Sequence, residues 1–259
     1  MTHLLATPAR AVRPSIPAAY QWERRKGRSP WYWPTIIALA VAGQALGYSQ
    51  YVTYLDEFRQ QNLTWAALWA QSMLLPTMLF FPLAIGAWVT QTATAEHDGS
   101  NWQRMAASRL AGTMVAGKVA AIGRIAVLTT LVAVGTFVAT GLLLGFDPQG
   151  LPPYLLRIIP IAVAIWATGM FVAWLGVVLR SFAGIMTATL GATLLGLALC
   201  VAAPEAAGLY PMAQITAATA ARTIEDVASV ASIAMAALVA AAWGMLWSMA
   251  LRIRVGRVS

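Results

Sequence analysis

The charged residues of this sequence are few and unevenly spaced, and this spacing limits what the chain can fold into. Only 26 of the 259 residues are Asp, Glu, Lys or Arg, and they leave six charge-free stretches of 22 to 36 residues. A helix that crosses a bilayer needs about 20 predominantly apolar residues. The sequence therefore predicts an all-α polytopic membrane protein with six transmembrane helices. Their expected ranges are 34–54, 67–92, 122–145, 158–179, 182–203 and 228–250.

The composition excludes a water-soluble monomer. Hydrophobic residues make up 59% of the chain and charged residues 10%, against roughly 45–50% and about 25% in an ordinary soluble domain. Strands of a membrane barrel would alternate apolar and polar residues, whereas 161–179 is apolar all round. Besides a transmembrane domain at 34–251, only residues 1–33 and the tail 252–259 are left, so no separate soluble domain fits.

Basic residues are concentrated in the segments on one side of the predicted spans. Fourteen of the 17 basic residues lie there, whereas six of the nine acidic residues lie on the other side. Because Lys and Arg are retained in the cytoplasm, both termini are predicted to be cytoplasmic. This topology accounts for the net charge of +8 without nucleic-acid binding. The first 28 residues contain no apolar core with a cleavage site, so we expect the first span to stay in the membrane.

The segment just before the first span, 15–33, mixes aromatic and basic side chains. Such a mixture is typical of an amphipathic helix that lies in the membrane interface and contacts anionic lipid. The charged residues that we assign to this interfacial helix are Glu23, Arg24, Lys26 and Arg28. A plain basic anchor with no further role is the alternative.

Two predicted spans carry polar side chains that are costly to leave unpaired in hydrocarbon. Gln44 and Tyr48 are four residues apart and share a face of the first span, and Gln71 and Ser72 lie in the second. We expect all four to face other helices or a wet cavity, and they are candidates for lining a pathway. Hydrogen bonds between helices, worth about 0.6 kcal/mol each, are the alternative.

Small residues at four-residue spacing predict close packing of helices. One such stripe lies in the sixth span and a shorter one ends the third; their members are Ser232, Ala236, Ala240, Gly244 and Ser248, and Gly141 and Gly145. Between the fifth and sixth spans, residues 202–223 are too polar and interrupted to cross the membrane. They could form short helices covered by protein, or an unstructured outer loop.

A match to the phosphate-binding loop can be dismissed. Gly112, Gly117 and Lys118 have the right spacing, but Val119 stands where a Ser or Thr must hold magnesium. No sheet-forming domain is predicted that could present such a loop. We therefore expect this chain to bind no ATP and no other cofactor.

Other site chemistry is also weakly supported. Cys200 has no partner for an internal disulfide. His3 and His97 lie outside the spans, so they cannot hold a haem or metal within the membrane. The cluster at 96–100 is no preformed triad, because adjacent residues of a helix point in different directions. We expect neither catalytic nor metal-binding residues.

The segment after the second span carries a resemblance to a known family. Its matching positions are Glu96, Gly99, Trp102 and Lys118, with Arg109 between them. A second matching segment precedes the first span, at Glu23, Lys26, Arg28 and Ser29. With six spans and this length, the chain resembles the ABC-2-type permeases, the membrane subunits of ATP-binding-cassette exporters, and is most similar to those of the lantibiotic-immunity group.

The resemblance implies a permease that exports an amphipathic or hydrophobic substrate, such as an antimicrobial peptide, across a bacterial inner membrane. It implies a soluble ATPase partner in two copies, which carries the ATP and magnesium, and a second permease subunit, identical or homologous. A helix between the second and third spans would couple to the ATPase, with Trp102, Met105 and Leu110 as its apolar anchor. The expected coupling residues are Glu96, Gly99, Trp102, Arg104, Met105 and Arg109. The alternatives are an autonomous channel or ion-coupled carrier, and a membrane scaffold or sensor.

Overall fold

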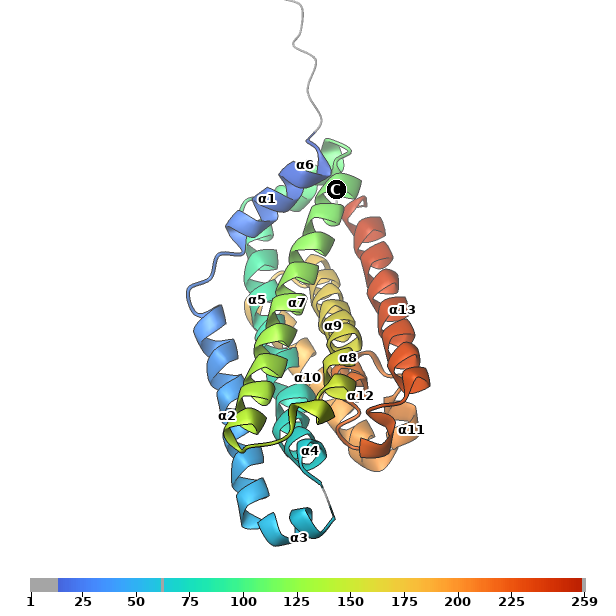
Figure 1. Cartoon of the computed structure of the whole chain (residues 1–259). Helices are drawn as coiled ribbons and strands as arrows, with labels where there is room; N and C mark the ends of the chain where they lie inside the picture. The colour runs from blue at the N-terminus through green and yellow to red at the C-terminus, as the bar shows by residue number, and fades with distance from the viewer. Residues whose placement is uncertain (1–13, 62, 258–259) are drawn as a thin grey trace, which may run out of the picture.

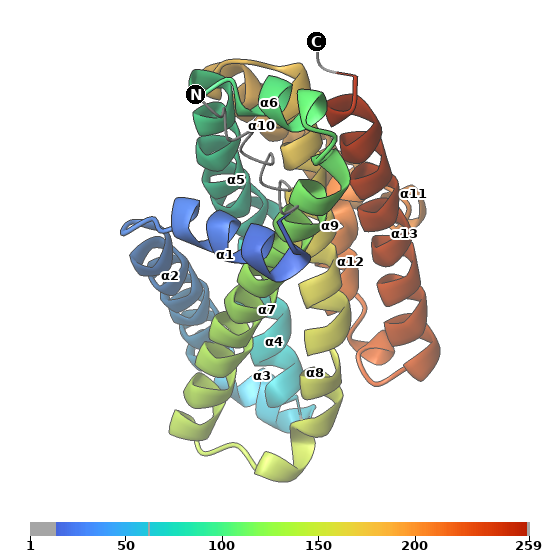
Figure 2. The ribbon, with the colours of Figure 1, turned by 90° about the horizontal axis from the view of Figure 1, so that it is seen from above.

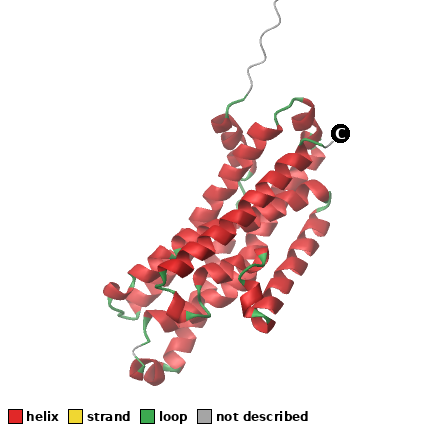
Figure 3. Ribbon diagram, turned by 90° about the vertical axis from the view of Figure 1, so that its right-hand side faces the viewer, coloured by secondary structure: helices red, strands yellow, loops and turns green. Residues whose placement is uncertain are grey.

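The computed structural model describes residues 14–61 and 63–257, and these residues form a bundle of helices without a strand (Figures 1 and 3). The histidine at position 3 and the first part of the expected N-terminal tail lie outside the described residues. The longer helices are α1 (Ile16–Lys26), α2 (Tyr32–Thr53), α4 (Trp65–Leu75), α5 (Phe81–Asp98), α7 (Ala111–Leu143), α9 (Ile158–Val178), α10 (Phe182–Ala202) and α13 (Val230–Val255). The shorter ones are α3 (Leu55–Gln60), η1 (Pro76–Phe80), α6 (Asn101–Ala107), η2 (Pro148–Gly150), α8 (Pro152–Leu156), α11 (Pro204–Ala207), η3 (Pro211–Ala213), α12 (Gln214–Thr219) and η4 (Ile224–Asp226).

Five helical segments are long and apolar enough to cross a membrane, which makes the chain a multi-pass membrane protein. They are Trp65–Asp98, Ala111–Leu143, Pro148–Val178, Phe182–Ala202 and Val230–Val255. The first predicted span also forms a helix, α2, but it is not among these five, because polar residues such as Gln44 and Gln50 lower its mean hydropathy. Helix α7 begins at Ala111, well before residue 122, where the third span was predicted to start. Lys118, which precedes the predicted span, is therefore part of this helix.

The bundle has two distinct ends (Figure 1). Helices α1 and α6 and the last turns of α13 lie at one end, which we call the α6 end. Helices α3 and α11 lie at the opposite end, the α3 end. The segment from α4 to α5 runs between the two ends with one π-helical turn, η1, at Pro76. Proline has no backbone N–H to continue the α-helical ladder, so an irregular turn at this position is expected.

Helix α9 lies at the centre of the bundle and packs against α5, α7, α12 and α13. Its residues Ala164, Ile165 and Met170 are fully buried. The small-residue stripe of α13 faces it: Gly244 lies against the Trp166 ring so closely that a Cβ there would come within 2.1 Å of a ring atom. The small residues of this stripe therefore allow α13 to pack closely against α9, as predicted.

The two glycines at the end of α7 have different roles. A Cβ on Gly141 would lie 2.1 Å from the Trp65 ring, so this glycine permits close packing, as predicted. A Cβ on Gly145 would meet no atom within 4 Å among the described residues, and the φ of Gly145, +78°, is left-handed. It ends the helix instead, because a residue without a side chain adopts this conformation at little cost.

The connection from α10 to α13 folds back into the protein as short helices. In α12, Ile215, Ala218 and Thr219 are buried against α9 and its neighbours. The indole N–H of Trp69 donates to the backbone carbonyl of Thr219 at 2.9 Å. Of the two alternatives left open by the sequence, short helices covered by protein are the observed one.

Candidate functional site

Helix α1 is held against α7 by a contact between small residues. Ser15 caps its first turn, and Gly27 ends it after three basic residues. Ala19 and Glu23 are four residues apart and are the two buried residues of the helix. A Cβ on Gly117 of α7 would lie 2.7 Å from the Ala19 backbone, so only glycine allows α1 to cross α7 this closely (Figure 2).

The loop after α1 is fixed as well. The Trp88 indole of α5 donates to the Gly27 carbonyl at 2.9 Å. A Cβ on Gly27 would lie 2.5 Å from the same ring, so the loop fits directly over it. Helix α1 is therefore attached to both α5 and α7, and this attachment brings the charged residues of the three helices together.

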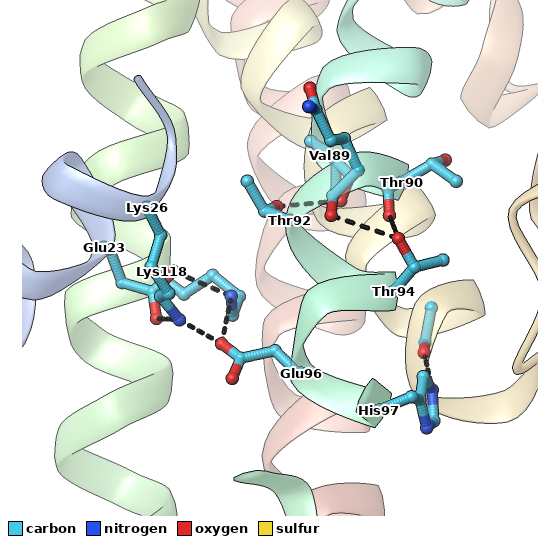
Figure 4. Close-up of polar contacts among 11 residues, drawn as sticks. Glu23, Lys26, Val89, Thr90, Thr92, Thr94, Glu96, His97 and Lys118 are labelled. Atoms are coloured by element: carbon cyan, nitrogen blue, oxygen red, sulfur yellow. Dashed lines mark hydrogen bonds and ion pairs between the residues drawn. The ribbon is translucent and has the colours of Figure 1, made fainter. Parts of the chain in front are cut away.

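Four side chains from these helices form an ion-pair network (Figure 4). Lys118 of α7 lies 2.7 Å from Glu23 of α1 and 3.4 Å from Glu96 of α5. Lys26 of α1 lies 2.6 Å from Glu23 and also pairs with Glu96. Each lysine thus contacts both carboxylates, and the two positive and two negative charges balance. We call these residues the α1–α5–α7 network.

The network is shielded from solvent. Glu96 is 0%, Glu23 3% and Lys118 4% exposed. Burial raises the pKa of Glu23, but the charges and hydrogen bonds of Lys118 and Lys26 outweigh it, so the pKa lies below its usual value of 4.5. Among the described residues, one oxygen of Glu96 has no hydrogen-bond partner. Since an uncompensated buried charge is costly, the four residues depend on one another.

Helix α6 packs directly on this network. The Trp102 ring lies under the Lys118 ammonium, 5.5 Å from the ring centroid. Trp102 is 1% exposed, and Met105 is also buried. Next to them, the His97 ring contacts the Gly176 carbonyl of α9 at 2.6 Å. The short helix therefore joins α5 and α7 at a point fixed by a charge–ring contact.

The surface of α6 differs from what we expected. Trp102 and Met105 are buried within the chain, so their side chains do not form an exposed apolar anchor, and Glu96, another expected coupling residue, is buried in the network. Arg104 is exposed but bonds the turn before α6, donating to the Gly99 carbonyl and to Asn101 Oδ1. The side chains of Trp102 and Met105 point inward because they cover Lys118.

In the turns on either side of α6, one residue has a left-handed backbone conformation. Ser100 has a φ of 52° and Arg109 a φ of 54°. Gly99, the glycine of the family pattern, ends α5 with a φ of −88° instead. The Arg109 side chain is exposed, so the surface presented by α6 and its turns is basic and polar.

The residues assigned to the interfacial helix divide into two groups. Arg24 and Arg28 are exposed, and so is Trp22, as expected for contact with lipid or solvent. Glu23 and Lys26 instead point inward and belong to the network. The two segments singled out by the family resemblance, before the first span and after the second, thus meet at this site.

The four pathway candidates do not gather at one surface of the chain. Gln44 and Ser72 are buried, whereas Tyr48 is 50% exposed and Gln71 is also exposed. Ser72 lies in the contact between α2 and α4, where a Cβ on Gly47 would come within 2.7 Å of its Cβ. Within the described residues, the side-chain amide oxygen of Gln44 and the Ser72 hydroxyl have no hydrogen-bond partner.

A buried arginine at the α3 end, Arg157, was not expected from the sequence. The Arg157 guanidinium donates to the carbonyls of Val227 at 3.1 Å, Ala218 at 3.3 Å and Asp226, and to the Ser232 hydroxyl at 3.0 Å. Its only signal in the sequence is its position as the charge directly before the uncharged stretch 158–179. It ties the α10–α13 connection to the start of α9.

The dismissed motifs lie in regular structure. Gly112, Gly117 and Lys118 are all part of the continuous helix α7. Glu96 and His97 point to different sides of α5 (Figure 4). Over residues 14–61 and 63–257, no group of three His, Cys, Asp or Glu side chains could hold a metal ion. The chemistry supported by this site is therefore charge pairing between helices.

Comparison with models of known protein families finds no match for this chain, and comparison with curated proteins finds none either.

Proposed function

We propose that this chain is the permease subunit of an ATP-binding-cassette exporter, coupled at α6 to a soluble ATPase. The observation that carries the proposal is the position of α6 on the α1–α5–α7 network. Two short turns join α6 to the long helices α5 and α7, and Trp102 fixes it to Lys118. A force applied to this helix would therefore reach both membrane spans together with α1.

The charge distribution supports the orientation that this function requires. The α6 end carries the basic residues of α1, Arg104, Arg109 and the arginines that end α13. By the positive-inside rule this end faces the cytoplasm, where an ATPase would bind. In this arrangement α2 is a span as well, the first in chain order, and brings the total to six. Its 22 residues extend about 33 Å at the rise of an α-helix, enough to cross the hydrocarbon.

One chain supplies half of the proposed transporter. The complete assembly contains a second permease subunit, identical or homologous, and two ATPase subunits that bind ATP and magnesium. The exposed Tyr48 and Gln71 are then available to a pathway between two permease chains, while Gln44 and Ser72 serve the contact of α2 with α4. The substrate class, an amphipathic or hydrophobic molecule such as a peptide, rests on the family resemblance alone.

The test is reconstitution of the full chain with the ATPase encoded beside it. We expect a stable complex in detergent and a changed rate of ATP hydrolysis in proteoliposomes. Arg109→Glu should weaken the complex, because it reverses an exposed charge beside α6. Arg59→Glu makes the same change at the α3 end and should leave binding intact. If the wild-type chain neither binds the ATPase nor alters its hydrolysis rate, the proposal is wrong.

Two further measurements separate the alternatives. Uptake driven by an ion gradient into liposomes that contain this chain alone would identify an autonomous carrier. The buried network lies in the last turns of α5 and the first turns of α7, not midway along the spans, and this position disfavours ion coupling. Gln71→Leu should change transport by a conduit that this exposed residue lines, but should leave a scaffold or sensor unaffected.

A further inference from the structure

A second feature, at the α3 end, is independent of the proposed function. A cavity of about 480 Å³ lies between α10, α11, α12 and the first half of α13. Its volume is within the range of ligand sites, which is about 300–1,000 Å³. Most of its wall is apolar, and the residues used below are Cys200, Met235, Ala236 and Val239.

The cavity is open along α13. Met235, which lines it, is 62% exposed. In the 18-residue window that defines α13 as a span, only 11% of the residues are buried within the chain. An apolar molecule in the surrounding membrane could therefore reach the cavity sideways, without crossing a polar surface.

Polar groups lie on the side of the cavity formed by the α10–α13 connection. Thr216 is 4% exposed, and its hydroxyl has no hydrogen-bond partner in the described part of the chain. Arg222 and Asp226 also line the cavity, and both are exposed. The charged groups are therefore one positive and one negative, at the polar edge of an otherwise apolar space.

This arrangement discriminates between classes of amphiphile. An anionic headgroup would pair with Arg222 but would be repelled by Asp226, and a cationic one would meet the reverse. A headgroup with both charges can satisfy both residues.

We propose that the cavity binds a zwitterionic phospholipid. One of its two acyl chains lies in the cavity along Met235, Ala236 and Val239, its phosphate pairs with Arg222 and its ammonium with Asp226. The second acyl chain stays in the surrounding membrane, on the open side along α13. The site lies far from α6, so it is separate from the proposed ATPase contact.

The test compares two lipids that share their acyl chains, dioleoyl phosphatidylethanolamine and dioleoyl phosphatidylglycerol. The full chain in detergent is mixed with each lipid, and the retained lipid is measured by native mass spectrometry. We expect up to about fivefold preference for the zwitterionic lipid, since an exposed ion pair such as that with Asp226 is worth up to about 1 kcal/mol. Equal retention of both lipids would overturn the proposal.

Variants locate the site. Ala236→Trp should fill the cavity and abolish the preference, whereas Leu238→Trp, on the exposed side of the same helix, should preserve it. Arg222→Glu alters only an exposed charge, so it should fold normally and lose the preference. If Ala236→Trp and Arg222→Glu both retain the zwitterionic lipid as the wild type does, the lipid binds elsewhere and the proposal is wrong.

Cys200 gives a second readout, because it is the only cysteine of the chain and lines the cavity. At the same lipid concentration, phosphatidylethanolamine should slow its alkylation by N-ethylmaleimide more than phosphatidylglycerol does. Equal slowing by both lipids would contradict the proposed headgroup selectivity.

Discussion

The two ends of the bundle bury charge in different ways. At the α6 end, two lysines and two glutamates compensate one another across three helices. At the α3 end, Arg157 is compensated mainly by backbone carbonyls and one hydroxyl. Ion pairs between separate helices can be broken by moving a helix or by adding a proton. A guanidinium that binds carbonyls has no carboxylate partner that acid could protonate. The comparison indicates an adjustable contact at one end and a permanent one at the other.

The largest effect is expected from Lys118→Met. The substitution keeps the length of the side chain but leaves Glu23 and Glu96 with only Lys26 to compensate them. Breaking a buried ion pair on one side costs about 3–5 kcal/mol. We expect the melting temperature in detergent to fall sharply. Arg124→Met is the matched control, since Arg124 is exposed on the same helix. An equal melting temperature for the two variants would show that the network does not stabilise the fold.

Arg157→Met should have the next largest effect. It leaves buried carbonyls, including that of Ala218, without a donor, at about 1–3 kcal/mol for an unsatisfied group. The loss should be concentrated in the α10–α13 connection, so hydrogen exchange should rise in α12 and stay unchanged in α1. Arg59→Met removes an exposed charge at the same end and should alter neither. Faster exchange in α1 would contradict the independence of the two ends.

Gly117→Ala tests whether packing, rather than charge, holds α1. The new Cβ would overlap the Ala19 backbone, and overpacking typically costs about 1–3 kcal/mol. We expect trypsin to cleave faster at the exposed Arg24 and Arg25 when α1 is displaced. Gly135→Ala is a matched control on α7, where a Cβ meets no atom within 4 Å among the described residues. Unchanged cleavage in Gly117→Ala would mean that the ion pairs alone fix the helix.

The smallest effect is a dependence on pH. Because the pKa of Glu23 lies below 4.5 in the folded chain, its carboxylate contributes stability above that value, and this stability is lost as the pH falls through the lowered pKa. The melting temperature should therefore decrease as the pH falls below about 4.5, and Glu23→Gln should flatten this decrease. Arg157→Met should retain the wild-type slope. A slope that Glu23→Gln leaves unchanged would assign the acid sensitivity to other carboxylates.

Much of the helical architecture could be predicted from the sequence. The uncharged stretch 181–204 corresponds to α10, and the stretch 158–179 corresponds to α9. The first predicted span does form a helix, α2. Its polar residues lower its mean hydropathy, so it is not one of the five apolar segments. Short structures were harder to predict. The π-helical turn at Pro76 and the burial of α12 both depend on the neighbouring helices. These helices supply hydrogen-bond partners and shield the short segments from solvent.

The candidate site could be predicted in its members but not in its arrangement. Glu23, Lys26, Glu96 and Lys118 all belonged to segments that resemble the permease family, but nothing in the sequence paired them. The inward direction of Trp102 was also missed, because an aromatic residue on a short helix suits an exposed anchor as well as a buried contact. The burial of Arg157 could not be predicted from the sequence, since a lone arginine next to a span is usually solvent-exposed.

The sequence by itself determined that this chain is a helical membrane protein, because the length of an apolar segment is a local property that can be compared directly with the thickness of a bilayer. Only the tertiary structure decided which charges meet. Lys118 and Glu23 are 95 residues apart, and their pairing depends on how closely α1 crosses α7 at Gly117. That approach is set by the packing of three helices together, and no single segment contains the information.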